Sequence, residues 1–143
     1  MNIFPPQRKY LIALLAVLQL TATHAFADER ELLPLNQEQQ QWVKETMRRM
    51  LETLGAIQGD LAQENTQAIA SRIQQMNQYQ SDTKPQRIGR SFPQGFRAMA
   101  NGMHQQWDAL AESASVSEAL KNSQQLMNYC NACHRSYRLP SDE

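Results

Sequence analysis

The sequence predicts an all-α protein, and three observations lead to this fold class. Four segments place apolar residues three and four positions apart, the spacing that lines one face of a helix. No segment of useful length alternates apolar and polar residues with the period of a strand. Two of the three connections between the segments are short, which is typical of neighbouring helices that run in opposite directions. These observations together predict an antiparallel four-helix bundle.

The first helix is expected at residues 36–58. Asn36 and Gln39 match the capping-box pattern, in which each side chain bonds the backbone N–H of the other residue. Gly59 and Asp60 predict its end, because both residue types favour turns. Its inward face is predicted to carry apolar residues at 4-3-4-3 spacing: Val43, Met47, Met50, Leu54 and Ile57.

The second helix is expected at residues 66–79, with Asn65 as its cap. Its inward face is predicted to carry Ile69, Ile73, Met76 and either Tyr79 or Gln80. Residues 80–92 contain Pro85, Gly89 and several polar side chains without helical spacing. They therefore predict one long surface connection.

The third helix is expected at residues 93–112, because Pro93 suits a first helical turn. The fourth is expected at residues 116–138, where Ser115 and Glu118 form a capping-box pattern and Pro140 stops the helix. The inward residues are Phe96, Met99, Met103, Trp107 and Leu110 in the third helix, and Ala119 or Leu120, Leu126, Met127, Cys130 and His134 in the fourth.

Residues 1–27 have the pattern of a secretory signal peptide. Arg8 and Lys9 precede an apolar run from Tyr10 to Leu20, and Ala25-Phe26-Ala27 offers a small-x-small cleavage site. The apolar run is too short to span a membrane comfortably. We therefore expect cleavage after Ala27, which indicates a protein that works outside the cytoplasm, in the periplasm if the source is a Gram-negative bacterium.

The remaining chain, residues 28–143, is expected to be a single domain. It keeps 12 of the 14 Lys and Arg residues and all 14 Asp and Glu residues, which gives a formal charge of about −2. This near-neutral charge predicts no nucleic-acid-binding surface. No further apolar stretch is long enough to span a membrane.

Both cysteines of the chain lie in one motif near the C-terminus, Cys130-x-x-Cys133-His134. On a helix, Cys130 and Cys133 lie on one face, and His134 lies one turn beyond Cys130. C-x-x-C-H is the attachment motif for c-type haem, in which two thiols form thioethers and the imidazole binds the iron. The sequence therefore predicts one covalent haem c per chain.

Three other interpretations of the cysteines are weaker. A thioredoxin-like pair needs a neighbouring βαβ unit, and no strand is predicted. A structural zinc site needs four ligands, but His104 is the only other Cys or His residue after residue 27. A disulfide between these cysteines would close a very small loop within a helix, with poor geometry and little entropic gain.

The segment CNACHRSYR, residues 130–138, resembles the signature C-x-x-C-H-x-x-[YF]-R of the class II cytochromes c, the cytochrome c′ family and its low-spin relatives. The resemblance implies an exported four-helix bundle with covalent haem near the C-terminus of the last helix. It implies thioethers at Cys130 and Cys133, His134 as the proximal iron ligand, and Tyr137 and Arg138 at the family's positions, with Arg138 close to the haem. It also leaves open a homodimer that pairs through the first two helices.

The group that occupies the sixth coordination position of the haem iron distinguishes two functions. In an up-down-up-down bundle, the start of the first helix lies beside the end of the last, so the distal group is expected in the first half of the first helix. Met47 is the leading candidate because it lies on the inward stripe, with core packing as its competing role. Met50, Lys44 and His104 are the alternatives, and an empty position is the fifth option.

A filled sixth position suits electron transfer, whereas an empty one allows a gas such as nitric oxide to bind. The leading hypothesis is a one-electron carrier that is not an enzyme and that exchanges electrons with redox partner proteins which the sequence does not identify. The alternative is a gas-binding protein of the cytochrome c′ kind. A stress or maturation accessory with a structural haem is a third possibility that no sequence feature favours.

Overall fold

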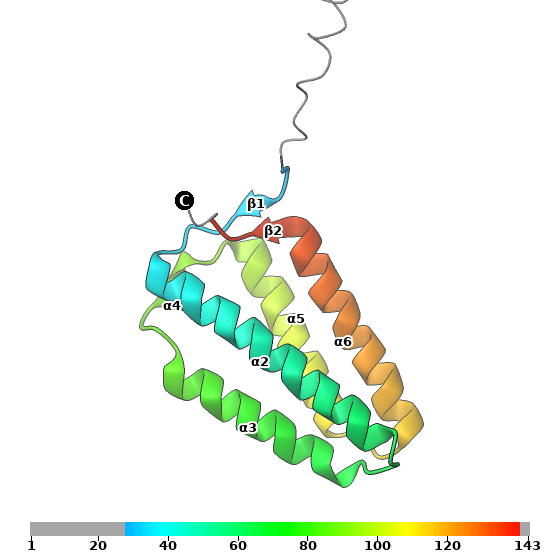
Figure 1. The fold of residues 1–143 in the computed structure, drawn as a ribbon. Coiled ribbons are helices and arrows are strands. Elements are labelled where there is room, and N and C mark those ends of the chain that lie inside the picture. Colours follow the sequence, from blue (N-terminus) through cyan, green and yellow to red (C-terminus); the bar gives the residue numbers. More distant parts are fainter. Residues whose placement is uncertain (1–27, 141–143) are drawn as a thin grey trace, which may run out of the picture.

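The structure of the protein is a computed structural model that describes residues 28–140 and is predominantly helical (Figure 1). The elements, in chain order, are β1 (Glu31–Leu32), α2 (Gln37–Leu61), α3 (Gln67–Thr83), α4 (Ile88–Ser91), α5 (Gln94–Ala111), α6 (Val116–Ser136) and β2 (Tyr137–Arg138). The prediction of a mainly helical protein is confirmed, whereas the short strands β1 and β2 were not predicted. The predicted signal peptide, residues 1–27, lies outside the described residues.

The predicted start of the first helix is confirmed by its cap. The Gln39 N–H donates to Asn36 Oδ1 at 2.9 Å, and the Asn36 N–H donates to Gln39 Oε1 at 3.2 Å. At the start of α6, the Glu118 N–H donates to Ser115 Oγ at 3.2 Å, while the Glu118 carboxylate accepts from the Ala114 N–H at 2.9 Å. Local sequence therefore defines both helix starts, because the caps satisfy N–H groups that have no partner within the helix.

The predicted end of the first helix is wrong by three residues, because α2 continues through Gly59 and Asp60 to Leu61. The side chain of Asp60 accepts hydrogen bonds from Nε and Nη2 of Arg72 on α3, the second at 3.0 Å. This ion pair between helices holds the last turn of α2 against α3. The predicted cap Asn65 is also wrong, since Thr66 precedes α3 without a capping side chain.

The connection at residues 80–92 is more ordered than its composition predicts. Helix α3 extends to Thr83, whose hydroxyl accepts a hydrogen bond from Trp42 Nε1 at 3.1 Å, and the short helix α4 follows at residues 88–91. Ile88 at the start of α4 is fully buried. A single apolar residue carries no periodic signal, which explains why the spacing of residues did not predict α4.

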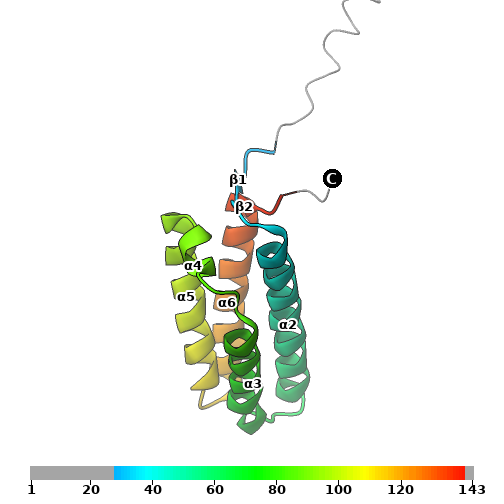
Figure 2. The ribbon, with the colours of Figure 1, turned by 90° about the vertical axis from the view of Figure 1, so that its left-hand side faces the viewer.

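Consecutive long helices run in opposite directions (Figures 1 and 2). The most extensive contacts between long helices are those of α5 with α6 and of α2 with α3, while α2 and α6 contact each other less than α3 and α5 do. Figure 1 shows α2 and α6 diverging toward the end where β1 and β2 lie. Strand β1 pairs with β2 in parallel, with Glu31 opposite Tyr137 and Leu32 opposite Arg138. The start of α2 and the end of α6 therefore belong to the same end of the molecule.

The buried apolar residues form two clusters. The larger one, here called the main core, contains Met50, Leu54, Ile57, Leu61, Ile69, Ile73, Met76, Met103, Trp107, Leu110, Ala119 and Leu126. The smaller one, here called the end cluster, contains Leu33, Leu35, Val43 and Ile88, with half-buried Trp42, Phe92, Phe96, Tyr137 and Leu139 packed against it. Met47 packs against both clusters.

Candidate functional site

The C-x-x-C-H motif occupies the last turns of α6. The side chains of Cys130 and Cys133 are half-buried, whereas His134 is exposed. The helix ends at Ser136, where the Tyr137 N–H donates to the Cys133 carbonyl. The prediction that the helix continues to residue 138 is therefore wrong by two residues, because Tyr137 and Arg138 pair with β1 instead.

Both thiols are free, with no disulfide between them. Burial raises the pKa of the Cys130 thiol. Burial also raises the pKa of the Cys133 thiol, and the neighbouring Cys130 adds to this effect. A raised pKa keeps both groups as neutral thiols near neutral pH, since burial disfavours the thiolate.

Helix α5 contacts the motif directly through Met99. The Cys133 thiol donates a weak hydrogen bond to Met99 Sδ, with 3.7 Å between the two sulfur atoms. Two glycines flank Met99 on this face of α5 and leave room for tyrosines. A Cβ at Gly95 would lie 2.6 Å from Tyr137 Oη, and a Cβ at Gly102 would lie 2.7 Å from Tyr129 Cε1.

The spacing of apolar residues predicts only a core position for Met99. The two glycines on either side of Met99, seven residues apart, are the sequence feature that indicates a close helix contact at this position. Glycines on one helix face allow bulky groups to approach closely.

Tyr137 joins the motif to an aromatic group at the end cluster. Its ring meets Phe96 edge to face at 5.3 Å between centroids, and Phe96 stacks on Phe92 at 4.4 Å. Burial raises the pKa of Tyr137, and the Glu31 carboxylate contributes to the rise. The edge-to-face pair falls in the favourable range of centroid separations for ring pairs, and the stacked pair lies at its lower edge. The residues after His134 are thus anchored by packing and do not form a free helix end.

Arg138 has a buried donor without a hydrogen bond. Its Nε atom is buried and has no hydrogen-bond partner, although Asp28 Oδ2 lies 3.8 Å away. Buried donors are nearly always satisfied in folded proteins. The Nε donor of Arg138 therefore lacks an acceptor within hydrogen-bond distance at the motif end of the molecule.

The distal candidates occupy different surroundings. Met47 is half-buried between the two clusters, while Met50 is buried in the main core. The inward stripe of α2 differs from the predicted one, because Thr46 is buried and Met47 lies at its edge. Lys44 is exposed on α2.

His104 lies away from the motif on α5. It is exposed. It follows Gly102, which faces α6, by two positions in the sequence. Two residues rotate a helix by about 200°, so His104 points away from α6. Partial desolvation lowers the pKa of His104, although Asp108 opposes this change. These surroundings disfavour His104 as a partner for the motif.

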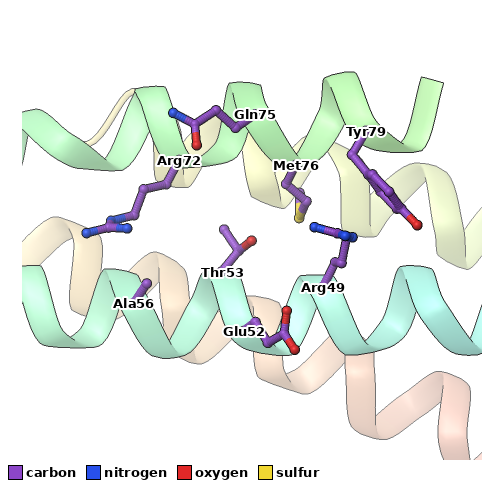
Figure 3. Close-up of a pocket in the computed structure, with 8 residues that line it drawn as sticks. All are labelled: Arg49, Glu52, Thr53, Ala56, Arg72, Gln75, Met76 and Tyr79. Atoms are coloured by element: carbon purple, nitrogen blue, oxygen red, sulfur yellow. The ribbon is translucent and has the colours of Figure 1, made fainter. Parts of the chain in front are cut away.

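The flanks of α2 and α6 that face each other carry exposed apolar side chains. On α2, Leu51 is 67% exposed and lies two residues from Arg49 and Thr53, which point toward α3 in Figure 3. On α6, Met127 is 41% exposed and lies two residues from Tyr129, which packs on α5. Because two residues turn a helix by about 200°, Leu51 and Met127 belong to the flanks between α2 and α6.

The side chains around the motif are of the chemical types that a covalent haem needs. Cys130 and Cys133 supply two thiols on one helix face, and exposed His134 supplies an imidazole one turn beyond Cys130. The guanidinium of Arg138, whose Nε lacks a hydrogen bond, can bind a carboxylate such as a haem propionate. The half-buried Met47 belongs to the helix that diverges from α6 at this end.

A separate cleft of about 240 Å³ lies between α2 and α3, away from the motif (Figure 3). The Arg49 guanidinium stacks on the Tyr79 ring at 3.7 Å and lies 3.4 Å from Glu45, and Arg72 is paired with Asp60. Both arginines are thus already engaged. No motif residue lines this cleft or the open hollow along residues 81–90.

Within residues 28–140, no three His, Cys, Asp or Glu side chains gather in a way that could hold a metal ion. No helix in the same range is long and apolar enough to cross a membrane.

Comparison of the chain with protein-family models, with curated proteins and with solved structures finds no match.

Proposed function

We propose that this protein is an exported c-type haem protein, an antiparallel four-helix bundle similar to the class II cytochromes c, that carries single electrons. One observation carries the proposal. Two half-buried thiols lie three residues apart on one helix, and an exposed imidazole follows them in the order C-x-x-C-H. The opposite directions of consecutive long helices and the shared end of α2 and α6 support the proposed bundle.

The chain's own residues have distinct roles in this proposal. Cys130 and Cys133 bind the haem as thioethers, His134 is the proximal ligand, and Arg138 lies close to the haem and balances its negative groups. The bound haem supplies one-electron redox chemistry. The rings of Phe92, Phe96 and Tyr137 exclude water from the protein side of the site. No residue in the proposal acts as a catalyst, so we propose a carrier and not an enzyme.

The sixth ligand decides between the two candidate functions. Met47 is the proposed ligand, because it lies between the two clusters on the half of α2 nearest the motif end. With Met47 bound, the iron is low-spin and suits electron transfer. An empty sixth position would favour the gas-binding alternative. Met50, Lys44 and His104 are the remaining candidate ligands, and of these His104 has the least favourable position.

We propose that the protein acts in the periplasm after removal of residues 1–27 and that its partners are redox proteins. Its near-neutral charge predicts no strong long-range steering toward a charged partner. A homodimer through α2 and α3 stays an open prediction that sedimentation or light scattering can test.

The decisive experiment measures covalent haem attachment. The wild-type protein, expressed with a cytochrome c maturation system, is expected to keep its haem through acid–acetone extraction, because thioethers resist this treatment. A variant with both Cys130→Ala and Cys133→Ala is expected to lose it or to fail to accumulate. His134→Ala should keep the covalent link but change the absorption spectrum, since the proximal ligand is removed. A folded double variant with an inextractable haem would refute the proposal.

A second experiment identifies the sixth ligand. Ferric wild-type protein is expected to show a low-spin spectrum with the long-wavelength band of methionine ligation, and Met47→Ala is expected to become high-spin and to bind carbon monoxide. The control is Met50→Ala, which should keep the spectrum but lower the free energy of unfolding by about 2–5 kcal/mol. A high-spin wild type would favour the gas-binding function. A low-spin Met47→Ala variant would direct the search to Met50, Lys44 or His104.

A further inference from the structure

The segment Asp28–Leu33, here called the N-terminal clasp, lies along the end of α6. Glu31 and Leu32 pair in parallel with Tyr137 and Arg138, and the Leu33 N–H donates to the Arg138 carbonyl at 2.9 Å. Leu33 is only 3% exposed and belongs to the end cluster. The clasp is therefore held by backbone hydrogen bonds and by a buried side chain, immediately beside the C-x-x-C-H motif.

Arg30 of the clasp bonds the residue that carries the imidazole. Its Nη1 donates to the His134 carbonyl at 3.3 Å. In a continuing helix, this carbonyl would accept from the N–H of residue 138, but α6 ends at Ser136 and leaves it without that partner. A cation at a helix C-terminus is also favourable because of the helix dipole. Arg30 thus satisfies the backbone of the turn that holds His134.

Asp28 links Arg30 with Arg138. Its carboxylate accepts from Arg30 Nε at 2.8 Å and from Arg30 Nη2 at 2.6 Å. On the other side, Asp28 Oδ2 lies 3.8 Å from Arg138 Nε, the buried donor that lacks a hydrogen bond. The Asp28 carboxylate therefore offsets part of the positive charge at Arg138 and orients the side chain of Arg30.

We propose that the N-terminal clasp positions the haem ligand and tunes the haem potential, with Arg30 fixing the backbone of His134 and Asp28 offsetting the charge of Arg138. The inference rests on the proposed function. Ferric haem carries one more positive charge than ferrous haem, so a nearby cation favours the reduced state and a nearby carboxylate opposes it. Arg30 and Asp28 are positioning residues, since both act through another residue.

The first test measures the midpoint potential of the holoprotein by redox titration. Asp28→Asn is expected to raise the potential, because the charge of Arg138 is then less balanced. The matched control is Glu29→Gln, which removes the same charge from the adjacent exposed residue and should give a smaller shift. Asp28→Glu is expected to restore most of the wild-type potential. Equal shifts for Asp28→Asn and Glu29→Gln would overturn the role of Asp28.

The second test does not need haem, so it separates failure of the clasp from failure of the proposed function. In the haem-free chain, Arg30→Gln is expected to speed amide hydrogen exchange at residues 134–138 by about two- to tenfold, the factor that corresponds to one net hydrogen bond. Exchange in α3 serves as the internal control and should be unchanged, and Arg30→Lys should partly restore protection. Unchanged exchange at residues 134–138 in Arg30→Gln would overturn the role of Arg30.

Discussion

The two ends of the long helices are packed in different ways. Away from the motif, twelve buried residues from all four long helices form the main core, whereas the end cluster beside the motif has only four. The motif end instead contains half-buried thiols, an exposed imidazole, a half-buried methionine and a half-buried arginine whose Nε lacks a hydrogen bond. The N-terminal clasp and the aromatic contacts of Tyr137 lie at this end.

This difference places the residues that stabilise the fold and the residues of the proposed function in different parts of the molecule. A fully buried apolar side chain contributes about 1.5–3 kcal/mol relative to an exposed one, so the main core supplies most of the hydrophobic stabilisation. The motif end keeps reactive and ligating groups partly accessible, which a covalent cofactor requires. We infer that substitutions in the main core lower stability, while substitutions at the motif end mainly alter the properties of the proposed haem.

The largest effect on stability is expected from Leu126→Ala. Leu126 is fully buried on α6, so truncation should lower the free energy of unfolding by about 2–5 kcal/mol, through lost burial and a new cavity. Urea denaturation measures this change. The control is the next residue, Met127, which is 41% exposed, so Met127→Ala should change stability by less than about 1 kcal/mol. Equal losses would show that both flanks of α6 belong to the core.

A smaller effect is expected from Gly102→Ala, at the contact between α5 and α6. The added Cβ would lie 2.7 Å from Tyr129 Cε1, so the tyrosine must move, at a cost of about 1–3 kcal/mol. Gly55→Ala on α2 is the matched control, because nothing lies within 4 Å of the added Cβ. That change should stabilise the protein by about 0.5–1 kcal/mol. Thermal unfolding of the two variants should therefore shift in opposite directions, and a shared direction would contradict the close approach of α5 and α6.

The smallest effect is expected from the ion pair at the far end. The Arg72 guanidinium lowers the pKa of Asp60, so the folded state favours the ionised carboxylate. This contribution to stability is complete above the ordinary carboxyl pKa and is lost as the pH falls through the lowered value in the folded state. Between pH 7 and pH 3, Asp60→Asn should therefore lose less stability than wild type, as thermal unfolding can measure. The exposed Asp82→Asn control should follow wild type, and a similar slope for all three would exclude the ion pair as a source of acid sensitivity.

The sequence alone determined the helical class, the caps at Asn36 and Ser115, and the motif, because each depends on residues close together in the chain. Hydrophobic spacing and capping act within a few residues, so they can be recognised without a structure. The choice of Cys130, Cys133 and His134 rested on the same kind of local pattern. The role of these residues with haem stays a prediction.

Contacts between distant segments decided the rest. The extension of α2 to Leu61 depends on Arg72, and α4 depends on the burial of Ile88. The end of α6 at Ser136 depends on a strand pair more than a hundred residues apart in sequence, which also brings Arg30 to His134. Met99 reaches Cys133 only because glycines allow α5 and α6 to approach closely. Neither residue of such a pair lies in a local sequence pattern that predicts its partner. Only the tertiary structure therefore reveals these contacts.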